Sequence, residues 1–219
     1  MSTRTLPEIF LFSLGDEQLL EATHGSLLRA LAAKSNLSRA LNAKEALGLL
    51  DQNRQPKGIL VADPSIVGTK YNELSRALTT YVKNGGTVVL GGVFSALIRP
   101  NDLGRYMHDK WELPWKSGSY HRTTLFLNQE ELRRPEYGLL PSYSQKAVFL
   151  KHVDPALAWY AASDHSAVES SVPLPLSEID LLETPVAFAN IEDGNLGYVG
   201  DVNGEEGTKL VVLKMFGLT

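Results

Sequence analysis

The chain has 219 residues, of which 43% are hydrophobic and 21% charged, and its formal net charge is −4. Such proportions are ordinary for a globular protein with a sizeable core. The acidic and basic residues are interspersed and form no basic face, which argues against DNA or RNA as a partner. Cysteine is absent, and this excludes disulfide bonds, thiolate catalysis and cysteine-ligated metal centres.

The sequence carries no signal for a membrane. Residues 1–7 are polar and lack an apolar signal core,. No apolar run approaches the length of a membrane span. We therefore expect a cytoplasmic protein that does not associate with a membrane.

Apolar runs and amphipathic helices alternate along the first half of the chain. Strands are predicted at 8–14, 35–41, 58–63 and 87–90,. Helices are predicted between them, one beginning near His24 and the others at 43–50 and 70–83,. The strand, helix and strand between 58 and 90 should form a right-handed βαβ unit.

The second half of the chain gives weaker signals. The pattern predicts a helix at 101–111, a loop at 113–121, strands at 122–128 and within 143–152, a hairpin of 185–191 with 196–200 that turns at 193–195, and a closing helix at 204–216,. We expect one domain over residues 1–219 with an irregular elaboration around 100–185. Strands 9–14, 59–63, 87–90 and 196–200 should be parallel neighbours in one sheet.

The stretch from 85 to 95 reads Gly-Gly-Thr-Val-Val-Leu-Gly-Gly-Val-Phe-Ser. Its apolar centre predicts a strand that is buried on both faces, and the second glycine pair lets the backbone turn sharply. Ligands of open α/β sheets bind beyond the carboxyl ends of the strands. The candidate site wall is therefore Gly91, Gly92, Phe94 and Ser95, with Asp63 at the end of the neighbouring strand.

Four places in this order resemble the class I glutamine amidotransferase-like superfamily, with the ThuA-like branch closest. They are His24-Gly25-Ser26, the strand end at 60–63, the helix end and strand at 81–90, and the late strand at 197–201. The resemblance implies an α/β, flavodoxin-like fold, a three-layer sandwich with a mostly parallel central sheet between helices. It also makes His24 a candidate for ligand binding.

The sequence departs from this superfamily at the nucleophile. Amidotransferases place a cysteine at the turn after the strand that matches 87–90, and ThuA-like proteins often place a histidine there. The matching positions here are Gly92 or Val93, and neither can attack a substrate. We therefore predict that the protein does not release ammonia from glutamine, so that the resemblance transfers a fold rather than an activity.

Ser95 has two interpretations. It could be a nucleophile if a base were positioned beside it and helix N-terminal amides formed an oxyanion hole. The surrounding residues do not form the Gly-x-Ser-x-Gly elbow of hydrolases. Ser95 could instead cap the helix that follows the turn.

The stretch 115–122 concentrates groups that could serve a site. His121 could act as an acid or base near neutral pH, Arg122 could clamp a carboxylate or phosphate, and Trp115 and Tyr120 could stack on a ring. We expect this loop to fold over the carboxyl edge of the sheet, facing Asp63, Phe94, Ser95 and Asp201. Alternatively, its aromatic residues pack on the core and Arg122 forms a structural ion pair.

Asp201 follows the last strand. It could orient His121 at the carboxyl edge, or it could serve the helix dipole at the start of the closing helix. No two of the five histidines have the His-x-x-x-His spacing, so no metal site is predicted,. The sequence has no Gly-x-Gly-x-x-Gly motif and no Walker loop, and we expect no cofactor.

Two functions from different classes remain open. The first is a degenerate amidotransferase-like module that binds a small polar molecule or a partner protein, with a homodimer left open. The second is a hydrolase or lyase that acts on a small polar or sugar-like metabolite with His121 and Asp201 as its acid–base residues.

Overall fold

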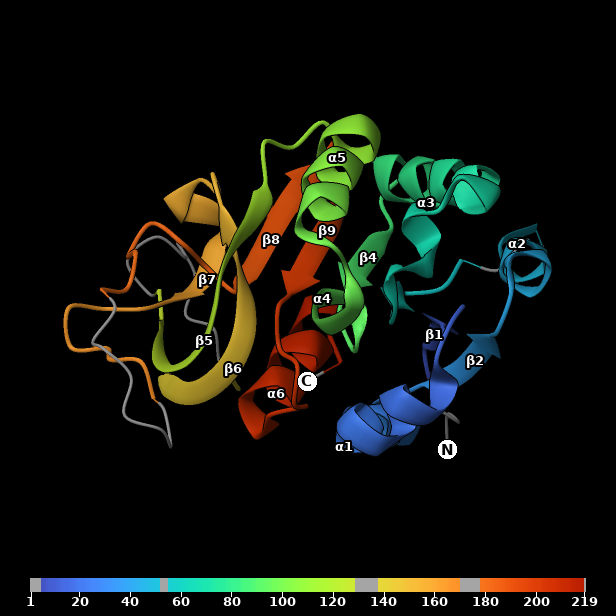
Figure 1. The fold of residues 1–219 in the computed structure, drawn as a ribbon. Helices are drawn as coiled ribbons and strands as arrows, with labels where there is room; N and C mark the ends of the chain where they lie inside the picture. The colour runs from blue at the N-terminus through green and yellow to red at the C-terminus, as the bar shows by residue number, and fades with distance from the viewer. Residues whose placement is uncertain (1–4, 52–54, 129–137, 170–177, 219) are drawn as a thin grey trace.

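The computed structural model describes residues 5–51, 55–128, 138–169 and 178–218. In this part of the chain, nine strands form one sheet in the order β2-β1-β3-β4-β9-β8-β7-β5-β6 (Figure 1). The strands are β1 (Glu8–Phe12), β2 (Asn36–Ala40), β3 (Gly58–Val61), β4 (Thr87–Leu90), β5 (Lys116–Leu127), β6 (Ser142–Lys151), β7 (Ala158–Ala161), β8 (Val186–Ile191) and β9 (Gly194–Val199). The α-helices are α1 (Glu17–Lys34), α2 (Ala43–Asp51), α3 (Asn72–Lys83), α4 (Phe94–Leu97), α5 (Pro100–Trp111) and α6 (Glu206–Met215).

One half of the sheet is parallel. Strand β1 pairs with β2 and β3, β3 pairs with β4, and β4 pairs with β9, all in the parallel sense. The prediction that the strands around 9–14, 59–63, 87–90 and 196–200 are parallel neighbours is confirmed. Their runs are apolar without alternation because each of these strands is buried on both faces.

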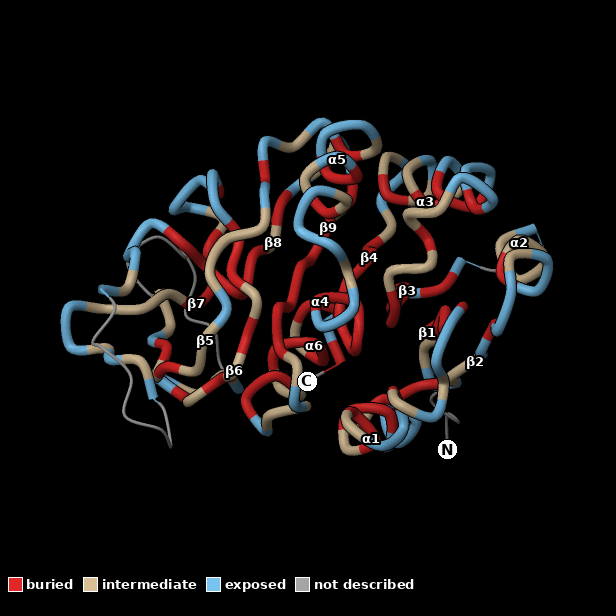
Figure 2. The backbone as a smooth tube through the Cα atoms, in the orientation of Figure 1, coloured by how far each residue is buried: buried red, intermediate tan, exposed pale blue. Residues whose placement is uncertain are grey.

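Helices cover both faces of the parallel half. Phe10 and Phe12 of β1 pack into one core with side chains of α2, α3 and α5. Ile9 and Leu11 point to the opposite face and pack with α1 and α6, because successive side chains of a strand alternate between faces. Figures 1 and 2 show the two helical layers and the buried strands between them.

The other half of the sheet is antiparallel and curls back on itself. Strands β9, β8, β7, β5 and β6 pair antiparallel in turn. The outer side of β6 then bonds to the chain directly after β9: Val148 N–H donates to Gly200 O at 2.9 Å, and Val202 N–H donates to Lys146 O at 3.0 Å. The expectation of a mostly parallel sheet is therefore correct for one half only, since the second half forms by hairpin-like pairing.

The stretch expected as a loop at 113–121 is mostly strand. β5 begins at Lys116, and a register irregularity lies between Ser117 and Tyr120. Position 118 in this irregular segment requires a glycine, because a Cβ atom on Gly118 would lie 2.6 Å from Oε2 of Glu183. The elaboration expected around 100–185 contains α5, β5, β6 and β7, while its residues 129–137 and 170–177 lie outside the described residues.

Two element boundaries also differ from expectation. Helix α1 begins at Glu17, where Oδ1 of Asp16 accepts the N–H of Leu19 at 2.9 Å, and the position expected as its start, His24, is a kink with φ −118° and ψ 15°. The β8–β9 turn falls earlier than 193–195, with Glu192 in the left-handed region at φ 51°.

Candidate functional site

Asp63 lies where β3 ends, and its carboxylate holds the turn after β1. Oδ2 accepts the N–H groups of Leu14 and Gly15, and Oδ1 accepts the N–H of Ser65 at 2.9 Å. The side chain is buried. Asp63 thus stands at the predicted edge of the sheet, but backbone donors of the protein occupy its oxygens.

The glycine turn after β4 is closely packed. Gly92 has φ +61°, and a Cβ atom there would lie 2.8 Å from Cδ1 of Leu20 and 2.9 Å from the carbonyl oxygen of Ala62. Gly91 has only ordinary contacts, the nearest at 3.5 Å, and Phe94 is fully buried in the core. Protein atoms fill the space beside Gly92 in which a ligand was expected.

Ser95 joins two elements at the carboxyl edge. It is the second residue of α4, and its hydroxyl group contacts the carbonyl oxygens of Gly200 at 2.9 Å and Asp201 at 3.1 Å. A hydroxyl that donates to backbone carbonyls in a buried position acts as a structural tie. It also lies too far into the helix to cap it, since the cap position of α4 is Val93.

Asp201 organises the loop between β9 and α6. Its Oδ1 accepts N–H groups from Asn203 at 2.9 Å and Gly204 at 3.2 Å, and its Oδ2 accepts the N–H of Glu205 at 2.7 Å. The carboxylate is buried. These contacts agree with the interpretation in which Asp201 serves the start of the closing helix, α6.

His24 lies against this loop from the kink of α1. The hydroxyl of Thr23 donates to Leu19 O at 2.7 Å, so its oxygen accepts from Nδ1 of His24 at 2.8 Å. Nδ1 therefore carries the hydrogen, and Nε2 carries a lone pair that has no partner in the described part of the chain,. Burial lowers the pKa of His24, and the charge of Asp201 opposes that shift.

Two side chains of β6 complete a buried polar group that the sequence analysis did not find. Nε2 of Gln145 donates to Oγ1 of Thr208 at 2.8 Å, while Oε1 of Gln145 has no partner among the described residues. The hydroxyl of Tyr143 lies near Thr208 without an ordinary hydrogen bond. Burial raises the pKa of Tyr143 well above its usual value, and the charge of Asp201 adds to this shift.

We call His24, Tyr143, Gln145, Asp201 and Thr208 the junction cluster. Its members surround the loop after β9 and the first turn of α6, where the parallel and antiparallel halves meet. It combines one carboxylate, which backbone amides satisfy, with two unused acceptors and one unused phenol hydroxyl. A sequence signal existed: Tyr143 and Gln145 share the strand face of buried Ala147, where apolar residues are the rule,.

Arg122 lies at the outer side of the junction cluster. It forms an ion pair with Glu205, both side chains being partly exposed, and donates to the hydroxyl of Ser144 at 3.1 Å. Glu205 also contributes to the raised pKa of Tyr143. The expected anion clamp therefore already has a carboxylate partner.

His121 does not contact Asp201. Ala147 of β6 pairs with His121 on one side and with Asp201 on the other, so a whole strand lies between the two residues. The ring of His121 stacks on Phe149 with centroids 4.4 Å apart. Burial lowers its pKa, and the acidic group that opposes the shift is Glu183, which the sequence analysis did not single out.

The two aromatic residues of the stretch 115–122 lie apart. Trp115 is only 1% exposed and packs in the core with α5. Tyr120 is 57% exposed, and Nζ of Lys146 lies 5.3 Å from its ring centroid. They do not form the two walls of one pocket.

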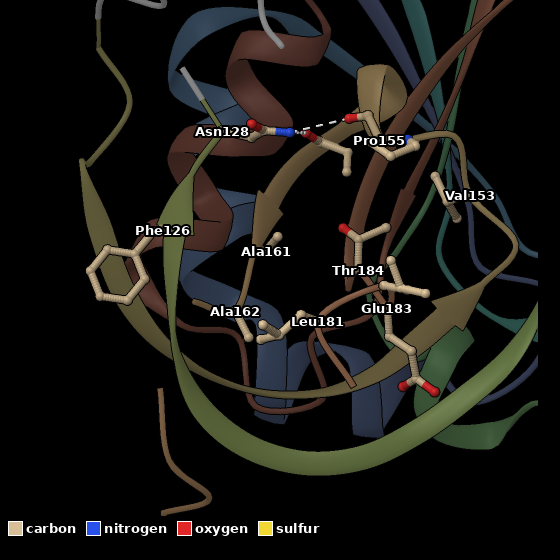
Figure 3. Close-up of a pocket in the computed structure, with 11 residues that line it drawn as sticks. Phe126, Asn128, Val153, Pro155, Ala161, Ala162, Leu181, Glu183 and Thr184 are labelled. Atoms are coloured by element: carbon tan, nitrogen blue, oxygen red, sulfur yellow. Dashed lines mark hydrogen bonds between the residues drawn. The ribbon is translucent and has the colours of Figure 1, made fainter. Parts of the chain in front are cut away.

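A pocket of about 300 Å³ lies in the antiparallel half, and we call it the β7 pocket (Figure 3). Its lining includes Ala158, Ala161 and Ala162. Nδ2 of Asn128 donates to Pro155 O and Ala158 O, both at 3.1 Å, and the hydroxyl of Thr184 donates to Tyr160 O at 2.7 Å. The polar groups at its wall are therefore engaged by the protein.

No group of three or more histidine, aspartate and glutamate side chains is placed to hold a metal ion within residues 5–51, 55–128, 138–169 and 178–218. No helix in these ranges is both long and apolar enough to cross a bilayer.

No protein-family model matches this sequence, and no curated protein matches it. Solved structures share its fold. A ThuA-like protein from Parabacteroides merdae gives a TM-score of 0.56 at 12% identity over 97% of this chain and 88% of that protein. A β-galactosidase from Bacillus circulans sp. alkalophilus gives 0.56 at 12% identity over 96% of this chain and 30% of the enzyme.

A β-galactosidase from the Antarctic haloarchaeon Halorubrum lacusprofundi gives 0.56 at 16% identity over 97% of this chain and 30% of the enzyme. This chain thus spans less than a third of each β-galactosidase. At identities this low, the likeness extends to the fold alone. The chain is an α/β protein with a structural neighbour among ThuA-like proteins.

Proposed function

We propose that this chain is a degenerate class I amidotransferase-like protein with a flavodoxin-like fold, and that it binds a small polar molecule without glutaminase activity. The order β2-β1-β3-β4-β9 of the parallel half supports the flavodoxin-like assignment, because it repeats the 2-1-3-4-5 order of that fold,. Similarity to a ThuA-like structure supports the same superfamily.

Loss of catalysis follows from the turn after β4. The positions that match the nucleophile of the family are Gly92 or Val93: a Cβ atom on Gly92 would lie within 3 Å of Leu20 and Ala62, and a valine side chain has no nucleophilic atom. Ser95, three residues further on, has its hydroxyl engaged by two carbonyl groups. The hydroxyl of Ser95 is therefore not free to replace the nucleophile of the family.

Binding is carried by one observation: the junction cluster contains buried polar atoms that nothing in the described chain satisfies. Such atoms are rare in folded proteins and point to a bound molecule or water. His24 and Gln145 offer acceptors, while Tyr143 offers a hydroxyl donor. A neutral molecule with hydroxyl groups complements this set, whereas an anion would meet the charge of Asp201 while Arg122 is already paired.

The alternative function, a hydrolase or lyase on a sugar-like metabolite, has less support. It requires His121 and Asp201 to act together, and β6 separates them. The β-galactosidases that share the fold are too distant in sequence to carry their activity to this chain.

The test measures binding and ammonia release on the same protein. Thermal melts with a panel of monosaccharides and neutral polyols should identify a compound that raises the Tm. A ligand at 100 times its Kd adds about 2.7 kcal/mol, which corresponds to about 5–10 °C for a chain of this size. Incubation with glutamine should release no ammonia, and measurable turnover would refute the proposed loss of catalysis.

The decisive variant is Tyr143→Phe. It removes a hydroxyl that has no partner in the described part of the chain, so the stability should not fall. The Kd of the ligand should rise about two- to tenfold, the worth of one hydrogen bond. Tyr106→Phe is the matched control, because Tyr106 is a buried tyrosine of the other core whose hydroxyl also lacks a partner in the described part of the chain. A panel without any stabilising compound, or a Tyr143→Phe variant that binds as tightly as the parent, would reject the site.

A further inference from the structure

The hydroxyl of Thr23 connects α1 to the ring of His24. Its oxygen lies 2.7 Å from Leu19 O and 2.8 Å from Nδ1 of His24. A carbonyl oxygen can only accept, so the single hydrogen of the hydroxyl points to Leu19 O. The hydroxyl oxygen then accepts from Nδ1 of His24. Thr23 thereby holds the imidazole in the form whose hydrogen lies on Nδ1.

The loop after β9 keeps Thr23 and His24 in place. His24 departs from helical geometry, with φ −118° and ψ 15°. A Cβ atom on Gly204 would be 2.2 Å from Thr23 O and 3.3 Å from Cα of His24, so the loop lies directly against this kink. Asp201 in turn accepts the N–H of Gly204 at 3.2 Å. The position of Thr23 beside the ring is therefore supported by packing between α1 and this loop.

The hydrogen on Nδ1 decides what the junction cluster offers to a bound molecule. A neutral imidazole has one donor and one acceptor nitrogen, and the hydrogen bond made by one nitrogen fixes the role of the other. Nε2 of His24 is therefore an acceptor. His24 and Gln145 are both fully buried, and neither Nε2 of His24 nor Oε1 of Gln145 has a partner within the described part of the chain. These two buried acceptors require donors from the molecule that occupies the cluster.

We propose that Thr23 is a positioning residue for specificity: by keeping the hydrogen of His24 on Nδ1, it directs the lone pair of Nε2 to a hydroxyl group of the bound molecule. This inference rests on the proposed function and narrows its ligand to an alcohol, such as a sugar or another polyol. The oxygen of an ether or a ketone can only accept. It would therefore meet the lone pair of His24 without a hydrogen between them.

An amine is the other common donor, and the junction cluster suits it less. A buried ammonium group loses its hydration and needs a carboxylate to replace it. The carboxylate of Asp201 is already engaged by three backbone N–H groups, and Glu205 is paired with Arg122. The engagement of both acids favours a neutral hydroxyl group over a charged amine.

The first measurement needs no added molecule. NMR spectra that correlate the nitrogens and hydrogens of the histidine rings report which nitrogen carries the hydrogen above about pH 7, where histidine is neutral. The signals of His24 are identified by their absence from the spectrum of His24→Gln. They should show the hydrogen on Nδ1 in the parent. A hydrogen on Nε2 would overturn the inference, whatever the binding test on Tyr143→Phe gives.

Two substitutions of Thr23 separate positioning from folding. Thr23→Val keeps the shape and removes the hydroxyl, so the hydrogen of His24 should move from Nδ1 to Nε2, whereas Thr23→Ser should keep the parent signals. Thr79→Val is the matched control, because Oγ1 of Thr79 donates to the helix carbonyl four residues earlier, Ser75 O, at 2.9 Å and has no histidine next to it. It should leave the signals of His24 unchanged. A hydrogen that stays on Nδ1 in Thr23→Val would also overturn the inference.

Binding measurements connect the hydrogen on Nδ1 to specificity. The probes are glucose, galactose and myo-inositol, each beside its deoxyfluoro analogues, in which fluorine replaces one hydroxyl at similar size and cannot donate. For a probe that raises the Tm of the parent, Thr23→Val should raise the Kd about tenfold or more, because a donor on Nε2 then faces the donor of the probe. Fluorine at one position should weaken binding to the parent to a similar extent, and Thr23→Ser should bind like the parent.

The possible failures have different meanings. Equal affinity of the parent and Thr23→Val, or of a probe and all its fluorine analogues, would overturn the inference while the proposed binding function stands. If the hydrogen lies on Nδ1 but none of the three probes raises the Tm, the narrowed ligand class is rejected. The test on Tyr143→Phe then decides the proposed function with the other compounds of its panel.

Discussion

His24 carries a lone pair on Nε2 that no group in the described part of the chain uses. Burial lowers its pKa more than Asp201 raises it, and burial likewise lowers the pKa of His121. The folded protein therefore binds protons less readily than the unfolded chain, whose histidines titrate near 6.5. Stability then rises with pH through this region, because the unfolded state holds more protons.

The pH dependence can be assigned to His24 by substitution. The contribution of the two histidines to the free energy of unfolding of the parent should be fully present above about pH 6.5. It should be lost as the pH drops below this value. His24→Gln should show a smaller fall over the same interval, because one of the two titrating groups is gone. His108→Gln alters a histidine that is 82% exposed and should keep the slope of the parent. Urea denaturation at several pH values measures this, and equal slopes for parent and His24→Gln would contradict it.

The sequence analysis named residues of the proposed site singly, and it did not identify the partners that the structure gives them. His24 and Asp201 were both candidates, and the structure brings them into electrostatic contact. The partner predicted for Asp201 was His121. Whether these two residues meet depends on how β5, β6 and the chain after β9 align, and β6 lies between them. Pairing between strands far apart in sequence leaves no local pattern, so the position of β6 between the two residues was not visible.

At the scale of elements, the turn from β4 into α4 depends on two glycines with different roles. Gly92 adopts φ +61°, while Gly91 does not require a left-handed backbone and would tolerate a Cβ atom at ordinary contact distance. Only the second glycine is therefore fixed by both conformation and space. It places Phe94 in the core and Ser95 against the chain that follows β9.

Two alanine substitutions separate these roles. Gly92→Ala should destabilise the protein by at least about 1–3 kcal/mol from backbone strain alone, with a Tm loss of about 2–4 °C per kcal/mol. Contact of the new methyl group with Leu20 and Ala62 adds to this loss. Gly91→Ala should change the Tm by much less. Thermal melts of both variants beside the parent test the prediction, which fails if the two losses are equal.

Element prediction succeeded where the pattern was local. Helix α3 and strands β3 and β4 were predicted from the spacing of their apolar residues. This spacing reflects burial, since α3 packs one face on the sheet and both strands are covered on both faces. The start of β5 did not follow, since Ser117, Gly118 and Ser119 have the composition of a loop. Ser117 pairs with Leu150 of β6, whereas Gly118 and Ser119 lie in the register irregularity, where the glycine leaves space for the carboxylate of Glu183.

At the scale of the whole molecule, the two halves share β9 and the loop that follows it. β9 pairs parallel with β4 and antiparallel with β8, and Asp201 then pairs with Ala147 of β6. The junction cluster lies at this meeting point. A molecule bound there would contact α1, β6 and α6 together, which is why its effect should appear in the stability of the whole chain.

The return of β6 to the chain after β9 has a consequence for aggregation. An open sheet normally ends in two edge strands whose free N–H and C=O groups can recruit another chain. Here Gly200, Val202 and Thr184 bond to the outer side of β6 between Lys146 and Leu150. In the part of the chain that the structure describes, β2 is thus the terminal strand with a fully open side. It is short and polar, and Arg39 on it is held by Glu17 and Glu21, so the sheet offers a poor template for growth into fibrils.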